Sequence, residues 1–107
     1  MARRKPSPKD AVVRQLHEAL KRHYQPAHSA AKIAVKRYNS ASVRVRIIDP
    51  DFEGQSLTAR DDAIWEILDR LPDEVRSEIG LLLLLTPREA ETSLMNLEFE
   101  KPAASPL

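Results

Sequence analysis

The first run of apolar positions repeats at helical spacing. Between Val12 and Tyr24 an apolar side chain recurs every three or four residues, which places these side chains on one face of an α-helix. Ser7-Pro8 comes before this run, and a capping serine followed by a proline in the first turn is a typical helix start. Pro26 disfavours helical backbone in the residue before it. We therefore predict a helix that starts at Ser7-Pro8 and ends before Pro26.

The pattern then changes to alternation, which is typical of β-strands with one buried face. Residues 31–38 and 43–47 each alternate between aliphatic and basic or polar side chains. The residues between them, Asn39-Ser40-Ala41-Ser42, are typical of a turn. Two such runs around a short polar turn predict a β-hairpin. Its outer face is expected to carry Lys32, Lys36, Tyr38, Arg44 and Arg46.

A second helical stripe runs through residues 57–71. Its apolar side chains, from Leu57 to Leu71, recur on one helix face, and Ser56 or Thr58 can cap the start. Pro72 breaks this helix. The residues that follow, 73–76, are predicted to add one short helical turn.

Two further apolar segments are predicted as strands. Residues 79–85 are almost continuously apolar between two breakers, Gly80 and Pro87, which is typical of a central strand covered on both faces. In residues 95–100 apolar and polar side chains alternate, and this favours a fourth strand. The sequence leaves open whether residues 87–100 form a strand or a helix.

These segments predict one α+β domain. The order is α-β-β-α-(short α)-β-β, and the simplest arrangement that buries the apolar faces is a three- to four-stranded mixed sheet backed on one face by two main helices. The domain is expected to span residues 8–100. A flexible basic tail, residues 1–7, and a loose C-terminal tail, residues 101–107, are expected to flank it.

Composition narrows the function classes. The chain has no cysteine, which excludes disulfides, thiolate metal ligands and cysteine nucleophiles. The charged N-terminus has no apolar stretch behind it, and the longest apolar run, Leu81 to Leu85, is too short to span a bilayer. We therefore expect a cytoplasmic protein without a membrane segment.

Three short motifs resemble those of the BolA family. Phe52-Glu53-Gly54 follows the strand of residues 43–48, Arg60 lies near the start of the next helix, and Thr86-Pro87 ends the leucine-rich strand. BolA proteins show the same succession, with an F-x-G loop, a helix that opens with Arg-His-Arg, and an apolar strand that ends in Thr-Pro. The resemblance covers residues 10–90 in the order of elements. It implies an α+β fold related to the nucleic-acid-binding KH domain.

The sequence departs from the family where the family binds a metal cluster. BolA-like proteins are associated with glutaredoxin partners and a shared iron–sulfur cluster, held by a histidine after the arginine and by a His or Cys in the loop between the first two strands. Here the corresponding residues are Asp61-Asp62 and Asn39–Ser42. Aspartate is a hard oxygen donor and a poor substitute for imidazole toward such clusters. We therefore expect no cofactor and no metal. The KH-type GxxG loop is also absent, because the only glycines are Gly54 and Gly80.

The start of the second predicted helix is the candidate surface for a protein partner, whose identity the sequence does not give. Trp65 lies at the edge of the apolar stripe, and tryptophan is enriched at binding hot spots, although packing at the rim of the core would also explain it. The predicted partner-binding residues are Trp65, Arg60, Asp61 and Phe52.

The basic outer face of the hairpin allows two interpretations. Residues 1–46 carry twelve Lys/Arg and two acidic residues, whereas residues 47–107 carry five Lys/Arg and fourteen acidic residues. Like charges on paired strands are unfavourable, so an anion should neutralise them. That anion could be a nucleic-acid backbone, with Tyr38 stacking on a base. The favoured alternative is internal, with Asn96, Glu98 and Glu100 lying alongside.

Nothing in the sequence indicates catalysis. His17, His23 and His28 show no metal-binding spacing and are expected to be exposed helix histidines. Asp62 and Glu66, four residues apart, are better explained as part of a solvated helix face than as a cation site. The favoured function is a non-enzymatic protein-interaction module of the BolA type. The alternative is a nucleic-acid-binding protein, and the oligomeric state stays open.

Overall fold

The computed structural model describes residues 8–102, with side chains from residue 11 onward. Two segments lie outside the described residues: residues 1–7, which include the predicted basic tail and the predicted helix cap Ser7, and residues 103–107. The described residues form these elements, in chain order: α1 (Pro8–His23), η1 (Gln25–Ala27), β1 (Lys32–Asn39), β2 (Ser42–Ile48), η2 (Pro50–Phe52), α2 (Leu57–Leu68), α3 (Asp73–Arg76), β3 (Ile79–Leu85), α4 (Pro87–Thr92) and α5 (Leu94–Glu100).

The sheet has three strands in the order β1-β2-β3. β1 and β2 form the predicted antiparallel hairpin, and β3 runs parallel to β2, so the sheet is mixed as expected. The prediction of a central position for residues 79–85 is wrong. β2 is central, and β3 lies at the edge because no fourth strand covers its outer side in the described part of the chain.

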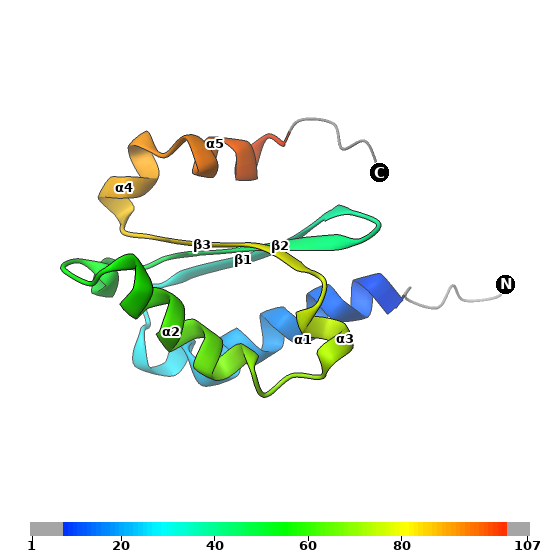
Figure 1. Cartoon of the computed structure of the whole chain (residues 1–107). Helices are drawn as coiled ribbons and strands as arrows, with labels where there is room; N and C mark the ends of the chain where they lie inside the picture. The colour runs from blue at the N-terminus through cyan, green and yellow to red at the C-terminus, as the bar shows by residue number, and fades with distance from the viewer. Residues whose placement is uncertain (1–7, 103–107) are drawn as a thin grey trace, which may run out of the picture.

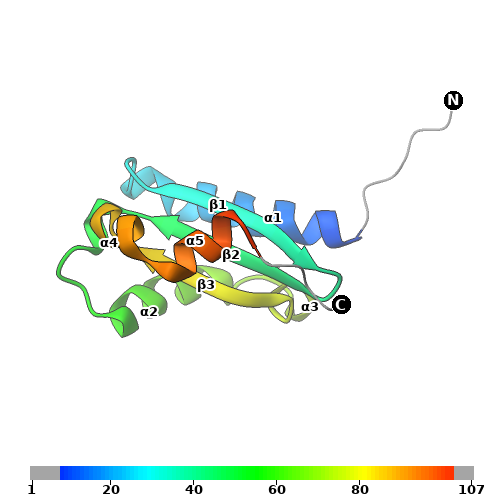
Figure 2. The ribbon, with the colours of Figure 1, turned by 90° about the horizontal axis from the view of Figure 1, so that it is seen from above.

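The two main helices, α1 and α2, back one face of the sheet as predicted, and two further helices that the sequence did not predict cover the other face. α1, α2 and α3 lie on one face, and α4 and α5 lie on the other (Figure 1). Seen from above, α5 runs over the sheet between its two edges (Figure 2). Among the described residues, no helix combines the length and the apolar character needed to cross a membrane.

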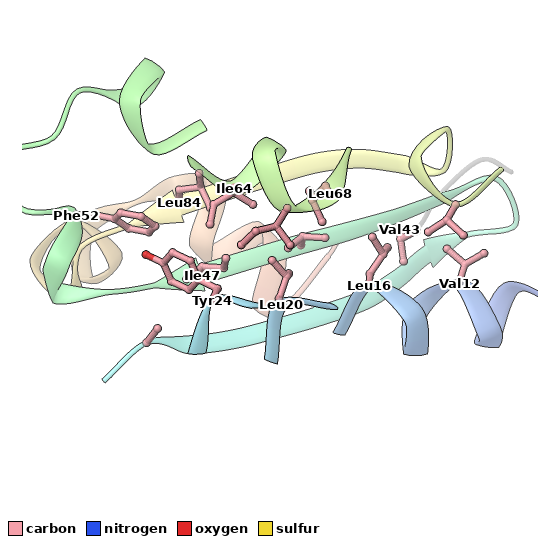
Figure 3. Close-up of a cluster of buried hydrophobic side chains, with 14 residues drawn as sticks. Val12, Leu16, Leu20, Tyr24, Val43, Ile47, Phe52, Ile64, Leu68 and Leu84 are labelled. Carbon is pink, nitrogen blue, oxygen red and sulfur yellow. The ribbon is translucent and has the colours of Figure 1, made fainter. Parts of the chain in front are cut away.

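The main core lies between the sheet and helices α1 and α2. From α1 the predicted stripe contributes Val12, Leu16 and Leu20, all buried. They meet the inward-facing side chains of β2, which alternate with its outward-facing arginines, and the buried face of α2 (Figure 3). The alternation in β2 therefore decides which side chains enter this core: Val43, Val45 and Ile47.

The C-terminal segment is helical, so the favoured fourth strand is incorrect. Thr86 caps α4 through a reciprocal capping box with Glu89, and Ser93 caps α5 by accepting a hydrogen bond from the backbone N–H of Asn96. Asn96 and Phe99 are three residues apart and both face the sheet, which is helical periodicity. An alternating pattern over six residues is compatible with a strand and with a short helix. The capping residues Thr86 and Ser93 favour the helix.

Candidate functional site

A groove lies beside the outer edge of β3, where α2 begins. We call it the β3 groove; its lining residues are Leu57, Asp61, Leu82, Leu83, Leu84 and Leu85. The lining therefore consists of leucine residues from two elements, with one carboxylate residue from α2. Apart from Asp61, the groove offers no charged group and no metal ligand within the described residues.

The residues that α2 contributes to the β3 groove, Leu57 and Asp61, are exposed to solvent. Ser56 caps the helix by accepting a hydrogen bond from the backbone N–H of Ala59, as one of the two predicted capping residues. Leu57 then stands in the first turn with 73% of its surface exposed. Leu57, Asp61 and Trp65 follow each other at intervals of four residues and so share one side of α2. Trp65 is half-buried against the core, which agrees with rim packing and leaves its partner role a prediction.

Phe52 and Arg60, two of the predicted partner-binding residues, are buried. Phe52 is 1% exposed and lies beneath the loop, whose turn uses Gly54 at φ 81°. Arg60 is 4% exposed, and its guanidinium is 5.5 Å from the centroid of the Phe52 ring. In this structure these two residues cannot contact a partner directly. They support the wall of the groove instead.

Arg60 connects three parts of the chain at the end of β3. Its Nη1 and Nη2 donate to the two carboxylate oxygens of Glu89, at 2.6 and 3.1 Å. Nη1 also donates to the carbonyl oxygen of Leu84 at 3.1 Å, and Nε donates to that of Gln55. One arginine therefore holds the loop before α2, the edge of β3 and the start of α4 together.

This arrangement predicts an acid-dependent loss of stability. The hydrogen bonds from Arg60, and after them that from the Thr86 backbone, lower the pKa of Glu89 from 4.5 to about 2. A lowered pKa in the folded state stabilises the protein fully above pH 4.5, and that stabilisation is lost as the pH falls toward 2. Urea unfolding at several pH values should show this loss in the wild type and a smaller one in Glu89→Gln. Glu91→Gln, on the same helix but exposed, is the control, and an equal pH profile in all three proteins would contradict the prediction.

The basic outer face of the hairpin is covered by α5. Lys36 lies directly opposite Arg44 in the sheet register, the like-charge pair that the alternation predicted. Arg44 pairs with Glu98 at 3.1 Å and Arg46 pairs with Glu100. The hydrogen bond from Arg46 lowers the pKa of the Glu100 carboxyl. The structure therefore contains the internal neutralisation that the sequence favoured. The acidic residues come from the helix α5, and not from the expected fourth strand.

Aromatic contacts complete this cover. The guanidinium of Arg44 stacks 3.5 Å from the centroid of Tyr38, so this ring already has a partner. Phe99 is 1% exposed, and Lys36 and Arg46 lie over its ring at 4.7 and 4.5 Å. Lys32, at the start of β1, stays exposed. The five predicted nucleic-acid-binding residues thus share one face, but that face is largely occupied.

His28 is not a helix histidine, contrary to the expectation. His17 and His23 lie in α1, whereas His28 follows the single turn η1. Its ring stacks on Tyr24 with centroids 3.9 Å apart, and its Nδ1 approaches the carboxylates of Asp49 and Asp51. Histidine spacing alone could not find this cluster, because His28 is more than twenty residues away from both aspartates.

Three comparisons place the chain against known proteins. The sequence matches no protein-family model and none of the curated proteins. Two solved structures are similar to it. BolA1 from Arabidopsis thaliana has 19% identity and a TM-score of 0.48, over 73% of this chain and 94% of that chain. The BolA domain of SufE1 from Arabidopsis thaliana has 21% identity and a TM-score of 0.49, over 79% and 99%.

One of these structures is a BolA protein and the other is the BolA domain of a larger protein. At these identities and TM-scores the likeness supports no conclusion about function, and the chemistry of the site has to come from this chain's own residues. Asp61, which follows Arg60 in α2, is exposed.

Proposed function

We propose that this protein is a non-enzymatic interaction module on a BolA-like scaffold, which binds an extended segment of a protein partner in the β3 groove. The outer edge of β3 carries the proposal. From Ile79 to Leu85 this edge strand has no charged residue and no proline, and the described residues place no strand beside it. Proteins usually protect such edges with charges, prolines or covering segments.

The other edge of the sheet shows the contrast. β1 carries Lys32, Lys36 and Arg37, and charged residues on an edge strand disfavour pairing with another chain. The two edges of the sheet therefore differ in charge, and charge on an edge strand disfavours the addition of another strand. An extended peptide that adds to β3 would form main-chain hydrogen bonds and place alternate side chains in the groove.

The backbone of β3 is oriented for such pairing. The carbonyl oxygen of Leu85 accepts a hydrogen bond from the backbone N–H of Asp49 on the β2 side. Because backbone groups alternate in direction along a strand, Leu84 and Leu82 face the outer edge. Arg60 donates to the Leu84 carbonyl, so the pairing positions that remain lie at and before Leu82.

The groove also indicates the chemistry of its partner. Leu57 and the leucines of β3 favour apolar side chains, and the exposed Asp61 favours a lysine or arginine next to them. We further propose that the module works without an iron–sulfur cluster. Asp61 and Asp62 in α2, and the side chains of the β1–β2 turn, supply neither imidazole nor thiolate.

Site-specific photo-cross-linking in the source cell tests the proposal. A photoreactive amino acid at position 57 is expected to cross-link one recurrent protein, and Asp61→Lys in the same chain should strongly reduce that product. Position 94 is the matched control, because Leu94 is 82% exposed but lies on α5, on the opposite face of the sheet. Both positions tolerate a large side chain because neither is packed.

Three results would contradict the proposal. The same products from positions 57 and 94 would indicate non-specific contact. Products that a nuclease removes would indicate nucleic acid in the groove. No product from position 57, with the protein folded and expressed at the usual level, would indicate that the groove has no macromolecular partner.

A further inference from the structure

His28, Asp49 and Asp51 bring three metal-ligand atoms to one point, away from the β3 groove lining. One ligand atom from each side chain lies within 4.8 Å of the others. His28 Nδ1 is 2.8 Å from Asp51 Oδ2 and 3.3 Å from Asp49 Oδ2. The cluster links the connection between α1 and β1 to the connection between β2 and α2, two segments that are distant in sequence.

Surrounding contacts hold two of these side chains in place. Asp49 is fully buried and accepts hydrogen bonds from the Tyr24 hydroxyl at 2.5 Å and from the backbone N–H of Asp51 at 2.9 Å. The Tyr24 ring stacks on the His28 ring at an interplanar angle of 7°. Burial and the hydrogen bond to Asp49 raise the pKa of Tyr24, so its hydroxyl keeps donating. Such outer contacts orient ligands in known metal sites.

The lone pairs of two carboxylate oxygens converge on the imidazole nitrogen, so either a proton on that nitrogen or a metal ion is needed between them. Two carboxylate oxygens are acceptors only, and an imidazole nitrogen is an acceptor unless it carries a proton. A proton on Nδ1 can form a short hydrogen bond with only one of the two oxygens. This agrees with the unequal distances from Nδ1, which are 2.8 Å to Asp51 Oδ2 and 3.3 Å to Asp49 Oδ2. A metal ion at this point would bind the nitrogen and both oxygens at once, and the proton of the imidazole ring would then be on Nε2.

We propose that His28, Asp49 and Asp51 form a zinc site. Ligands that are each 2.0–2.1 Å from a tetrahedral zinc lie about 3.3 Å from one another, which is the present separation of His28 Nδ1 and Asp49 Oδ2. Asp51 has to move outward by roughly half an ångström to meet this geometry, and its side chain is 57% exposed. The imidazole favours zinc over calcium or magnesium, which prefer oxygen ligands only.

The site is open to solvent on one side. The side chain of His28 is 29% exposed, whereas that of Asp49 is 1% exposed, so an ion enters past His28 and Asp51 and meets a fixed inner carboxylate. A water molecule would complete four ligands. The ion would join η1 to η2, next to the core residues Tyr24 and Phe52, whose ring centroids are 6.2 Å apart. Bound zinc is therefore expected to stabilise the fold.

Zinc titration of the full chain tests this proposal, with calorimetry and a competing chromogenic chelator as readouts. We expect one equivalent of Zn²⁺ to bind in the micromolar range and to raise the melting temperature. His28→Gln and Asp51→Asn should each weaken binding by more than roughly tenfold. Both side chains are partly exposed, so these variants are expected to fold, and circular dichroism checks this. Asp49 is left intact because it is buried.

His23→Gln and Asp62→Asn are the matched controls, since both residues are exposed on helices and neither belongs to the cluster. Their zinc affinity should equal that of the wild type. In ¹⁵N spectra of the imidazole rings, zinc should shift Nδ1 of His28 and leave His17 and His23 unchanged. The proposal is wrong if the folded wild type binds no zinc, or if the control variants lose affinity as much as His28→Gln does.

Discussion

Phe99→Ala is expected to lower the free energy of unfolding by about 3–5 kcal/mol, the usual loss for a buried phenylalanine. Phe99 is 1% exposed and is the buried residue of α5. Its ring also lies under Lys36 and Arg46, so the substitution removes apolar burial and two cation–π contacts together. Urea unfolding measures the change.

The same substitution is expected to detach α5 from the sheet. Apart from Phe99, α5 is held mainly by ion pairs between partly exposed groups, and such pairs contribute little individually. Amide hydrogen exchange in residues 94–100 should therefore become faster while exchange in β2 stays slow. Once α5 is detached, Arg44 and Arg46 face solvent, and retention on a heparin column should increase.

Leu97→Ala is the matched control for Phe99. Leu97 lies in the same helix but is 60% exposed, so the change should stay within about 0.5 kcal/mol and should not alter heparin retention. Equal stability losses in the two variants would show that α5 does not dock through Phe99. Unchanged heparin retention in Phe99→Ala, with α5 exchanging rapidly, would show that the ion pairs do not mask the basic face.

Arg60→Ala is expected to lower the free energy of unfolding by about 2–3 kcal/mol. The substitution leaves the Leu84 carbonyl without its donor and leaves Glu89 without its bidentate partner. The expected loss is less than that of a fully buried pair, because 42% of the Glu89 side chain is exposed and water can solvate it. The measurement is again urea unfolding, with hydrogen exchange at the end of β3.

A double-mutant cycle with Glu89→Gln separates the contributions of Arg60. If the ion pair dominates, Arg60→Ala should cost clearly less in the Glu89→Gln background than in the wild type. Arg70→Ala, at an exposed arginine near the end of α2, should change stability by about 0.5 kcal/mol or less. A similar loss at both arginines would contradict the role assigned to Arg60.

The structure contains the favoured explanation of the charge asymmetry of the chain. The basic first half and the acidic second half allowed either a surface for nucleic acid or internal neutralisation. In the folded protein, Glu98 and Glu100 come from the acidic half and neutralise Arg44 and Arg46 from the basic half. Within the described residues, the edge strand β3 has no charged residue and no strand on its outer side, and the proposed function assigns this edge to a protein segment.

The order α1–β1–β2–α2–α3–β3 and the core faces of α1 and β2 follow from the sequence alone. Periodicity was sufficient there because each of these two elements buries one apolar stripe, as Val43, Val45 and Ile47 do in β2. The apolar stripe of α2 was predicted too long, because Leu57 at its start is 73% exposed. The C-terminal segment was mispredicted because alternation over six residues fits both structures, although Thr86-x-x-Glu89 was a readable capping signal.

Which side chains are accessible, and which distant residues meet, follows from the packing of the elements and not from the sequence pattern. An arginine is usually exposed, but Arg60 is buried where it pairs with Glu89 and with the Leu84 carbonyl. The edge position of β3 depends on strand order, which a leucine run does not encode. The meeting of His28 with Asp49 and Asp51 depends on how two distant connections pack. Each of these outcomes rests on long-range contacts, and local patterns carry no information about them.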